Sequence, residues 1–255
     1  MSNVLILVTN DDGVRSPGLR SLAQTVADLG RVVVVAPDRN RSAVGHALTL
    51  EDPLRVDELK TDVYAVDGTP TDCVNLAIHG LLQQPPDLVI SGINRGSNVG
   101  DDITYSGTVS AALEACLMGV PAFAVSLDQL EFSERALATA AQFARRLAGR
   151  VLEQGLPANT FLNVNVPADP CRGVELTRQG KRQYGASVVR KQDPRGRYYY
   201  WLGGADVNYE DIPGSDCNAL QAGLISVTPL KANLTHEQAY TELLDWPLQS
   251  MIGKL

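Results

Sequence analysis

Several features that define large protein classes are missing from this sequence. Its four cysteines lie far apart, at Cys73, Cys116, Cys171 and Cys217. They form no CxxC pair and show no His–Cys spacing typical of a zinc site, so we expect reduced thiols. No apolar run approaches the ~20 residues that span a bilayer, and the N-terminus has no basic stretch ahead of a cleavable apolar segment. We therefore expect a cytoplasmic protein with no membrane partner.

Positive charge is scarce as well. The chain has 22 Lys and Arg against 29 Asp and Glu, for a formal net charge of -7. A surface for nucleic-acid polymers needs clustered Lys and Arg, so this balance argues against such a partner. There is no GxxxxGK(S/T) motif and no GxGxxG after the first apolar run, which disfavours nucleotide triphosphatases and dinucleotide-binding enzymes.

Strand and helix signals alternate along the first half of the chain. With 255 residues, 44% of them hydrophobic, the protein can bury a large core, and one large domain is favoured over two equal ones. Helices are predicted after the cap residue Ser16 as far as Gly30, from Thr71, and up to Gly119. Apolar runs predict strands at 4–9, 32–36, 63–66, 87–90 and 122–126. This order predicts an α/β fold, a doubly wound, mostly parallel sheet with helices on both faces and therefore three layers.

The pattern changes after about residue 130. A long amphipathic helix is predicted at 133–152, and the segments after it are strand-like, at 161–166, 174–177, 197–202 and 224–227. We therefore divide the chain into a core at 1–130, which carries the candidate metal and phosphate loops, and a region at 131–255. The second region completes the core and adds a smaller β-rich C-terminal extension.

An aromatic and basic segment at 195–201 is predicted to form a β-hairpin or arm. Its three tyrosines and one tryptophan stand in a row, so alternating strand geometry cannot bury all of them, and one face must meet another surface. We expect this segment to serve assembly of subunits. The alternatives are a hairpin packed on its own domain and an aromatic side chain that stacks on a nucleobase.

The most informative segment is the acidic turn at 10–13, where Asp11 and Asp12 directly follow a buried apolar run. Adjacent carboxylates repel each other unless a cation lies between them. Ser42 and Asn94 follow two further predicted strands, and ligands of open α/β sheets bind at the carboxyl ends of the strands. Oxygen ligands of these types suit one hard divalent cation, Mg²⁺, Mn²⁺ or Ca²⁺. The alternatives are an ordinary Asp-Gly turn, a helix cap at Ser42 and a left-handed turn residue at Asn94.

A second candidate site lies at Ser106, Gly107 and Thr108. Consecutive backbone N–H groups at a glycine turn that leads into a helix form a phosphate cradle, although an ordinary helix cap has the same residues. His46 follows Ser42 closely and is a candidate for acid–base chemistry or substrate contact. His79 is expected to be a packed or surface residue, and His236 a helix-start residue.

Seven motifs give the chain a resemblance to a known family. They are VTNDDG, APDRNRSAVGHALTL, DGTPTDCV, SGINRGSNVGDDITYSGTVSAA, LNVNVP, DPRGRYYYWLGG and ISVTPL. In this order, from about residue 4 to about residue 230, they resemble the SurE family of stationary-phase survival proteins, which are metal-dependent 5'- and 3'-nucleotidases.

The resemblance implies a Rossmann-like core and hydrolysis of nucleoside monophosphates. It implies one divalent metal ion per subunit, held by Asp11, Asp12, Ser42 and Asn94. It further implies that Asn98 and the segment at 106–108 line the phosphate site, and that homodimers or homotetramers form through the C-terminal arm.

The expected mechanism is metal-assisted hydrolysis, in which Asp11 or Asp12 accepts the proton of the attacking water. An aspartyl-phosphate intermediate is the rival route, because a carboxylate can itself be the nucleophile. A nucleotide-binding regulator without turnover is the alternative function. Cleavage of short polyphosphate, the preferred base and the sugar position are left open by the sequence.

Overall fold

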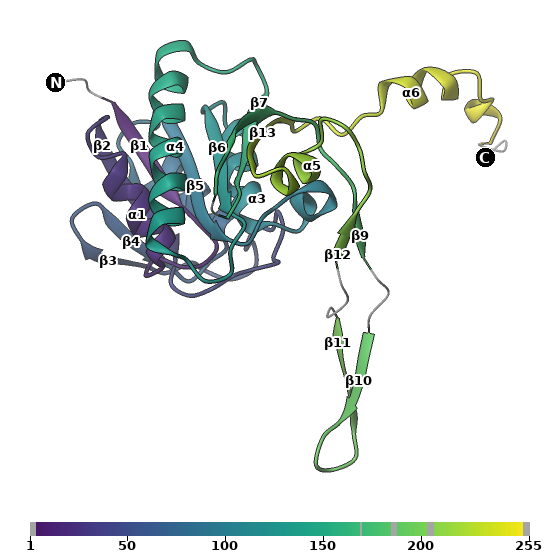
Figure 1. Ribbon diagram of the computed structural model, residues 1–255, viewed down its shortest axis with the longest axis horizontal. Coiled ribbons are helices and arrows are strands. Elements are labelled where there is room, and N and C mark those ends of the chain that lie inside the picture. Colours follow the sequence, from purple (N-terminus) through teal and green to yellow (C-terminus); the bar gives the residue numbers. More distant parts are fainter. Residues whose placement is uncertain (1–3, 169, 185–187, 203–206, 252–255) are drawn as a thin grey trace.

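The computed structural model describes residues 4–168, 170–184, 188–202 and 207–251. Its centre is a nine-stranded sheet in the order β3-β4-β2-β1-β5-β6-β7-β13-β8 (Figure 1). Pairing is parallel from β4 through β7 and again between β13 and β8, and antiparallel at β3–β4 and β7–β13. The strands are β1 (Leu5–Thr9), β2 (Arg31–Pro37), β3 (Val56–Lys60), β4 (Val63–Val66), β5 (Leu88–Arg95), β6 (Ala122–Leu127), β7 (Thr160–Val166), β8 (Gly173–Leu176) and β13 (Leu224–Lys231). The mostly parallel α/β sheet predicted from the sequence is confirmed.

Helices cover both faces of this sheet. The helices are α1 (Pro17–Thr25), α2 (Pro70–Leu76), α3 (Gly107–Leu117), α4 (Glu134–Gln154), α5 (Asp216–Gln221) and α6 (Glu237–Leu243), with shorter turns at η1 (Ala77–Leu81), η2 (Gly100–Thr104) and η3 (Leu248–Met251). Ile6 and Val8 of β1 belong to the core beneath α1 and α4, whereas Leu5 and Leu7 belong to the core beneath α2 and α3. Successive strand residues point to opposite faces, so β1 is buried on both sides. The sheet is therefore the middle of three layers, with helices on each face.

Local signals explain where the helices begin. The Ser16 hydroxyl accepts a hydrogen bond from the N–H of Leu19, and Pro17 occupies the first turn of α1. One expected helix boundary differs from the structure. Helix α1 ends at Thr25, not near Gly30, whose role is different: a Cβ there would lie 2.4 Å from the carbonyl oxygen of Val4. Gly30 therefore permits the close approach of two strand ends.

Strand β5 is longer than its sequence suggests. Residues 91–95 are predicted to be loop because they are rich in Gly, Ser and Asn, but they extend the strand to Arg95. They pair with β6, where Asn94 lies opposite Ser126 after a shift in register. A Cβ at Gly92 would lie 2.3 Å from the carbonyl oxygen of Val125, so the glycine is needed for this pairing. Tertiary pairing overrides the local turn composition here.

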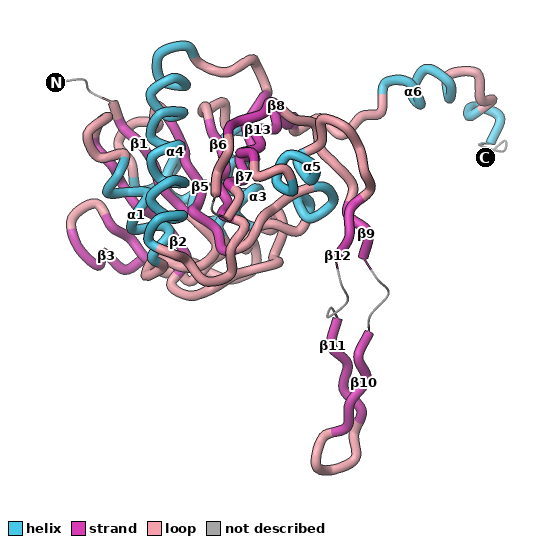
Figure 2. The backbone as a smooth tube through the Cα atoms, in the orientation of Figure 1, coloured by secondary structure: helices cyan, strands magenta, loops and turns pink. Residues whose placement is uncertain are grey.

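The C-terminal extension leaves the sheet as an arm (Figures 1 and 2). Its base is a pair of antiparallel strands, β9 (Arg182–Tyr184) and β12 (Val207–Tyr209), and its end is the hairpin of β10 (Val188–Gln192) and β11 (Tyr198–Leu202). All four cysteines are free, as expected. Among the described residues, no helix has the length and apolar character needed to cross a membrane. The division of the chain at residue 130 stays a prediction, although β7 and β13 join the same sheet as β1.

Candidate functional site

Loops at the carboxyl edge of the sheet meet the start of α3 at a pocket of about 220 Å³. The residues that line it are Asp11, Ser42, Ala43, Asn94, Arg95, Ser97, Asn98, Asp102, Tyr105 and Ser106. Five of them are residues singled out from the sequence, although they come from segments up to 95 positions apart. The parallel strands β1, β2 and β5 explain this convergence, because their carboxyl ends share one edge of the sheet.

Asp11 is buried against the first turn of α3. The Thr108 hydroxyl donates a hydrogen bond of 2.5 Å to Asp11 Oδ1. A Cβ at Gly107 would lie 2.9 Å from Asp11 Cβ and 3.1 Å from Asp11 Oδ2, so glycine allows the helix to approach the carboxylate. Burial raises the pKa of Asp11, and the hydrogen bonds from Thr108 and the backbone oppose this effect. Thr108 therefore orients Asp11 with a side chain that is itself fully buried.

Asp12 is half-buried and faces an adjoining cavity of about 270 Å³, whose lining includes Arg39 and Arg95. Its Oδ2 accepts a hydrogen bond of 3.3 Å from the N–H of Arg95. Desolvation, followed by the charge of Asp11, raises the pKa of Asp12 to about 6. Both carboxyl groups of the turn thus have raised pKa values, and a cation beside them would favour their ionised forms.

Asn94 and Ser42 do not have the structural roles considered as alternatives. Asn94 lies within strand β5, not in a left-handed turn, and its Nδ2 donates to the carbonyls of Arg95 (3.2 Å) and Gly96 (2.9 Å). Ser42 is exposed in the loop between β2 and β3, so it caps no helix.

The loop that carries Ser42 is held beside Asp11. The N–H of Arg41 donates to the carbonyl of Asp11 at 2.7 Å, and the N–H of Ser42 donates to Asn40 Oδ1 at 2.8 Å. Ala43 has a φ of 60°, a left-handed conformation that is rare for a residue with a side chain. The chain therefore turns sharply at the pocket, where such strained residues often occur.

The donor set fits a hard divalent cation. It offers two carboxylates, one amide oxygen and one hydroxyl, whereas thiolate and imidazole ligands are missing from it. Within the described part of the chain, no three His, Cys, Asp or Glu side chains lie close enough together to hold a metal ion. The ion would therefore depend on Asp11 and Asp12 with neutral oxygens from Asn94 and Ser42, which is a donor set for Mg²⁺, Mn²⁺ or Ca²⁺ and not for zinc.

Asn98 and Ser106 line the pocket and also hold its walls together. Asn98 Nδ2 donates to Ser126 Oγ at 2.8 Å, and the N–H of Asn98 donates to Asn165 Oδ1 at 2.7 Å. The Ser106 hydroxyl caps α3 by accepting from the N–H of Val109 at 3.1 Å. The helix cap considered as an alternative is thus present, and the first residues of the 11-residue helix, Gly107 and Thr108, lie against Asp11.

His46 lies apart from the pocket lining. Its Nε2 is 2.7 Å from Glu114 Oε2, and this buried carboxylate also accepts from Asn75 Nδ2 at 3.0 Å. The ring thereby ties the loop between β2 and β3 to helix α3. His46 is not among the residues that line the pocket, although the N–H of the preceding Gly45 donates to the carbonyl of Tyr105 at 3.1 Å, and a substrate role for His46 stays a prediction. His236 caps α6 through Nδ1, as expected of a helix-start residue.

Five residues of the pocket were not singled out from the sequence, and three of them have large polar or charged side chains. Asp102 belongs to a second pair of adjacent acids, Asp101-Asp102, so the signal that identified Asp11 was present there too. Tyr105 directly precedes the phosphate segment and is 62% exposed at the pocket edge. Arg95 lines both cavities, and its position directly after the candidate ligand Asn94 was the available signal.

Comparisons with known proteins identify relatives of this chain. A family model described as "Survival protein SurE" matches residues 6–186. The chain is 61% identical to 5'-nucleotidase SurE of Syntrophotalea carbinolica, over 96% of this chain and 98% of that protein. It is 58% identical to 5'-nucleotidase SurE of Geobacter sulfurreducens, over 96% and 94%. The crystal structure of a SurE protein from Aquifex aeolicus matches with a TM-score of 0.82 at 42% identity, covering 94% of this chain and 98% of that chain.

Proposed function

Because the chain belongs to the SurE family, we propose that it is a phosphomonoesterase that hydrolyses nucleoside 5'-monophosphates to nucleoside and phosphate. The observation that carries this proposal is the pocket that joins Asp11, Asn94 and Ser42 to the start of α3. Carboxylates beside a helix N-terminus provide both a cation site and an anion site within one small volume. A phosphomonoester needs both.

The residues of the chain have distinct parts in the proposed reaction. Asp11, Asp12, Asn94 and Ser42 would hold the metal ion, and Asn98 with the segment at 106–108 would contact the phosphoryl oxygens. Bound there, a divalent cation offsets the negative charge of the phosphoryl group. Thr108 fixes the orientation of Asp11 through its short hydrogen bond. Asn98, bonded to Ser126, fixes the opposite wall.

Hydrolysis breaks the bond between phosphorus and the ester oxygen. A water molecule attacks phosphorus, its proton passes to one of the carboxylates of the acidic turn, and the leaving oxygen takes up a proton as the nucleoside departs. The rival route begins with attack by a carboxylate and requires a second displacement by water. A substrate with chiral phosphorus separates the two routes, because one displacement inverts the configuration and two displacements retain it.

The finer features of the proposal come from the family resemblance. They are hydrolysis of nucleoside 3'-monophosphates as well, cleavage of short polyphosphate, one Mg²⁺, Mn²⁺ or Ca²⁺ ion per subunit, a cytoplasmic location, a function in stationary-phase survival, and a homodimer or homotetramer formed through the arm. Free thiols at all four cysteines are consistent with a reducing compartment.

Phosphate release tests the proposed function directly. Purified protein is treated with a chelator and then assayed with AMP, GMP and an aryl phosphate, with and without Mn²⁺. We expect release from both nucleotides that requires the metal, and loss of release in Asp11→Asn and Asp12→Asn. Tight binding of AMP without any release in the presence of Mn²⁺ would instead identify the nucleotide-binding regulator. Full activity of both variants at saturating Mn²⁺ would contradict the metal site.

A further inference from the structure

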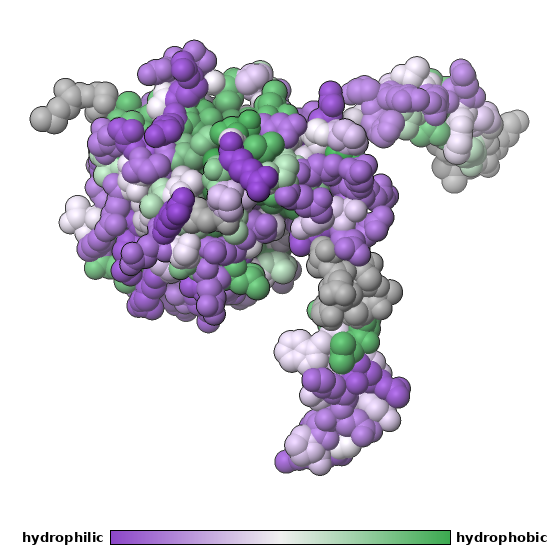
Figure 3. Space-filling view, viewed as in Figure 1, coloured by the Kyte–Doolittle hydropathy of each residue, from purple (hydrophilic) through white to green (hydrophobic). Residues whose placement is uncertain are grey.

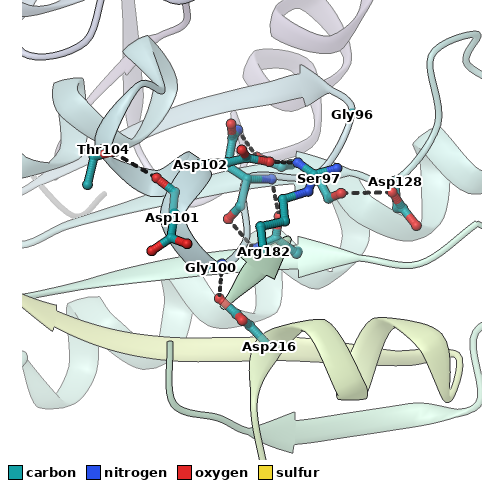
Figure 4. Close-up of polar contacts among 12 residues, drawn as sticks. Gly96, Ser97, Gly100, Asp101, Asp102, Thr104, Asp128, Arg182 and Asp216 are labelled. Atoms are coloured by element: carbon teal, nitrogen blue, oxygen red, sulfur yellow. Dashed lines mark hydrogen bonds and ion pairs between the residues drawn. The ribbon is translucent and has the colours of Figure 1, made fainter. Parts of the chain in front are cut away.

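Asp102 places a carboxylate in the wall of the pocket, and its partner comes from the arm. Arg182, the first residue of β9, forms an ion pair with Asp102 of η2 (Figure 4). Both side chains are 17% exposed, so water screens the pair only weakly. The guanidinium also lies over the ring of Tyr209, at 5.6 Å from its centroid. Contacts with two different elements thus hold Arg182 in place.

The segment that carries Arg182 is fixed to the same wall of the pocket. Gln179 Nε2 donates to the carbonyl of Gly100 at 3.0 Å, and the N–H groups of Gly100 and Gly180 both donate to Asp216, at 3.1 and 2.8 Å (Figure 4 shows the bond from Gly100). A Cβ at Gly100 would lie 3.1 Å from the backbone nitrogen of Arg182. The base of the arm, helix α5 and the start of η2 are therefore packed as one unit.

The charge of Asp102 needs this partner if the pocket binds phosphate. A carboxylate in the wall of a small, partly desolvated pocket repels a phosphoryl group, and removing a cationic partner of a partly buried carboxylate strengthens this repulsion. The hydroxyl of Ser97, which lies on the same loop, donates to Asp128 at 2.8 Å. It is therefore not available to take the place of the Arg182 guanidinium beside Asp102.

We propose that Arg182 is a positioning residue of the active site, which offsets the charge of Asp102 and fixes η2 as a wall of the phosphate pocket. This inference depends on the proposed function. It also makes substrate binding depend on the base of the arm, because Arg182 enters the site from β9, the strand that leads to the hairpin.

Four variants test this role: Arg182→Gln, Asp102→Asn, the double variant and Lys181→Gln. Lys181 is a matched control, since it is the neighbouring residue and pairs with Glu210, at 3.4 Å, and not with a residue of the pocket. We expect Arg182→Gln to raise KM for AMP at least tenfold with a change in kcat below threefold. The double variant should recover most of this loss, because the uncompensated carboxylate is gone. Lys181→Gln should keep the KM of the wild type.

Other outcomes overturn the inference. If Arg182→Gln and the double variant lose activity to the same extent, Arg182 is only structural. The same conclusion follows if the loss of activity is accompanied by a lower Tm and a lower molar mass in light scattering. If Arg182→Gln has the KM of the wild type, the ion pair is irrelevant to substrate. Both results require an active wild type. If the wild type itself releases no phosphate, the proposed function is wrong. If the wild type is active and only the variants behave differently from expectation, the inference about Arg182 is wrong.

Discussion

Asp12 sits half-buried next to Asp11, and desolvation together with that neighbouring charge raises its pKa to about 6. In the unfolded chain the pKa of an aspartate is near 3.9. Below about pH 4 the carboxyl group is protonated in both states and has no effect on stability. Between about pH 4 and pH 6, Asp12 ionises in the unfolded chain but stays largely protonated in the folded protein. Ionisation therefore favours the unfolded state, and the metal-free fold loses stability as pH rises. The pKa of Asp11 is shifted in the same direction.

We therefore predict that Asp12→Asn stabilises the metal-free protein in a pH-dependent way. In chelator-treated samples, the difference in Tm between the variant and the wild type should be near zero at pH 4 and grow to roughly a few degrees by pH 7. Comparing the two proteins cancels the contributions of other carboxyl groups. Added Mn²⁺ should raise the Tm of the wild type more than that of the variant at pH 7. A Tm difference that stays constant across this pH range would show that folding does not raise the pKa of Asp12.

Gly107 gives a second prediction at the residue scale. The sequence suggested that this position needs glycine for its backbone conformation, but the structure gives a different reason, which is contact of the helix with Asp11. We predict that Gly107→Ala lowers phosphate release roughly tenfold, since a small misplacement of a reacting group has large effects on rate. Gly107→Val should do more.

Gly149 is the matched control for this substitution. It lies within α4, and a Cβ there would meet nothing within 4 Å. Gly149→Ala should leave activity unchanged and raise stability by up to about 1 kcal/mol, because alanine favours helices. Equal activity of the two glycine variants would mean that activity does not depend on the close contact between the start of α3 and Asp11.

At the scale of elements, the hairpin of β10 and β11 has no partner layer among the described residues of the single chain. Every residue of both strands is exposed, including Tyr199 at 41% and Trp201 at 62%. Figure 3 shows apolar surface on the arm, and Val188 and Leu202 are exposed there as well. An isolated two-stranded hairpin is marginal in water, so another surface is expected to cover it. A second copy of the chain, bound through the arm, is the occupant that the family resemblance implies.

We predict that replacing both Tyr199 and Trp201 with serine lowers the molar mass in solution. These two side chains lie on one face of β11, since residues two apart in a strand point the same way. Light scattering should give a multiple of 27.4 kDa for the wild type and a smaller multiple for the variant. Arg195→Gln, in the turn of the same hairpin, is the control and should keep the mass of the wild type. An unchanged mass combined with weaker AMP binding would favour nucleobase stacking over assembly.

At the scale of the whole molecule, the acidic balance of charge limits the range of partners. With a net charge of -7, the surface repels phosphate polymers, and local groups at one pocket provide the attraction for a small anion. We predict that a fluorescently labelled RNA of about 20 nucleotides shows no change in anisotropy with up to about 10 µM protein at physiological salt. AMP should still protect the metal-loaded protein against thermal unfolding. Micromolar binding of the RNA would require a basic surface that the composition does not suggest.

Much of the fold could be predicted because its signals are local. The apolar run before Asp11, the cap at Ser16 and the small residues of α3 each specify an element from a few neighbouring side chains. The site was predictable in part for the same reason, since Asp11 and Ser42 follow strands, Asn94 lies near the end of one, and parallel strands end at one edge. Their assignment as metal ligands stays a prediction.

The sequence by itself determined the α/β class, the central strand and the acidic turn, because these depend on burial pattern and turn chemistry within short segments. Only the tertiary structure decided that residues 91–95 extend β5, that His46 pairs with Glu114 and that Arg182 reaches Asp102. Each of these contacts joins segments separated by 30 to 80 positions. Their energy comes from pairing across the sheet and from charges brought together by packing, and no local pattern encodes either.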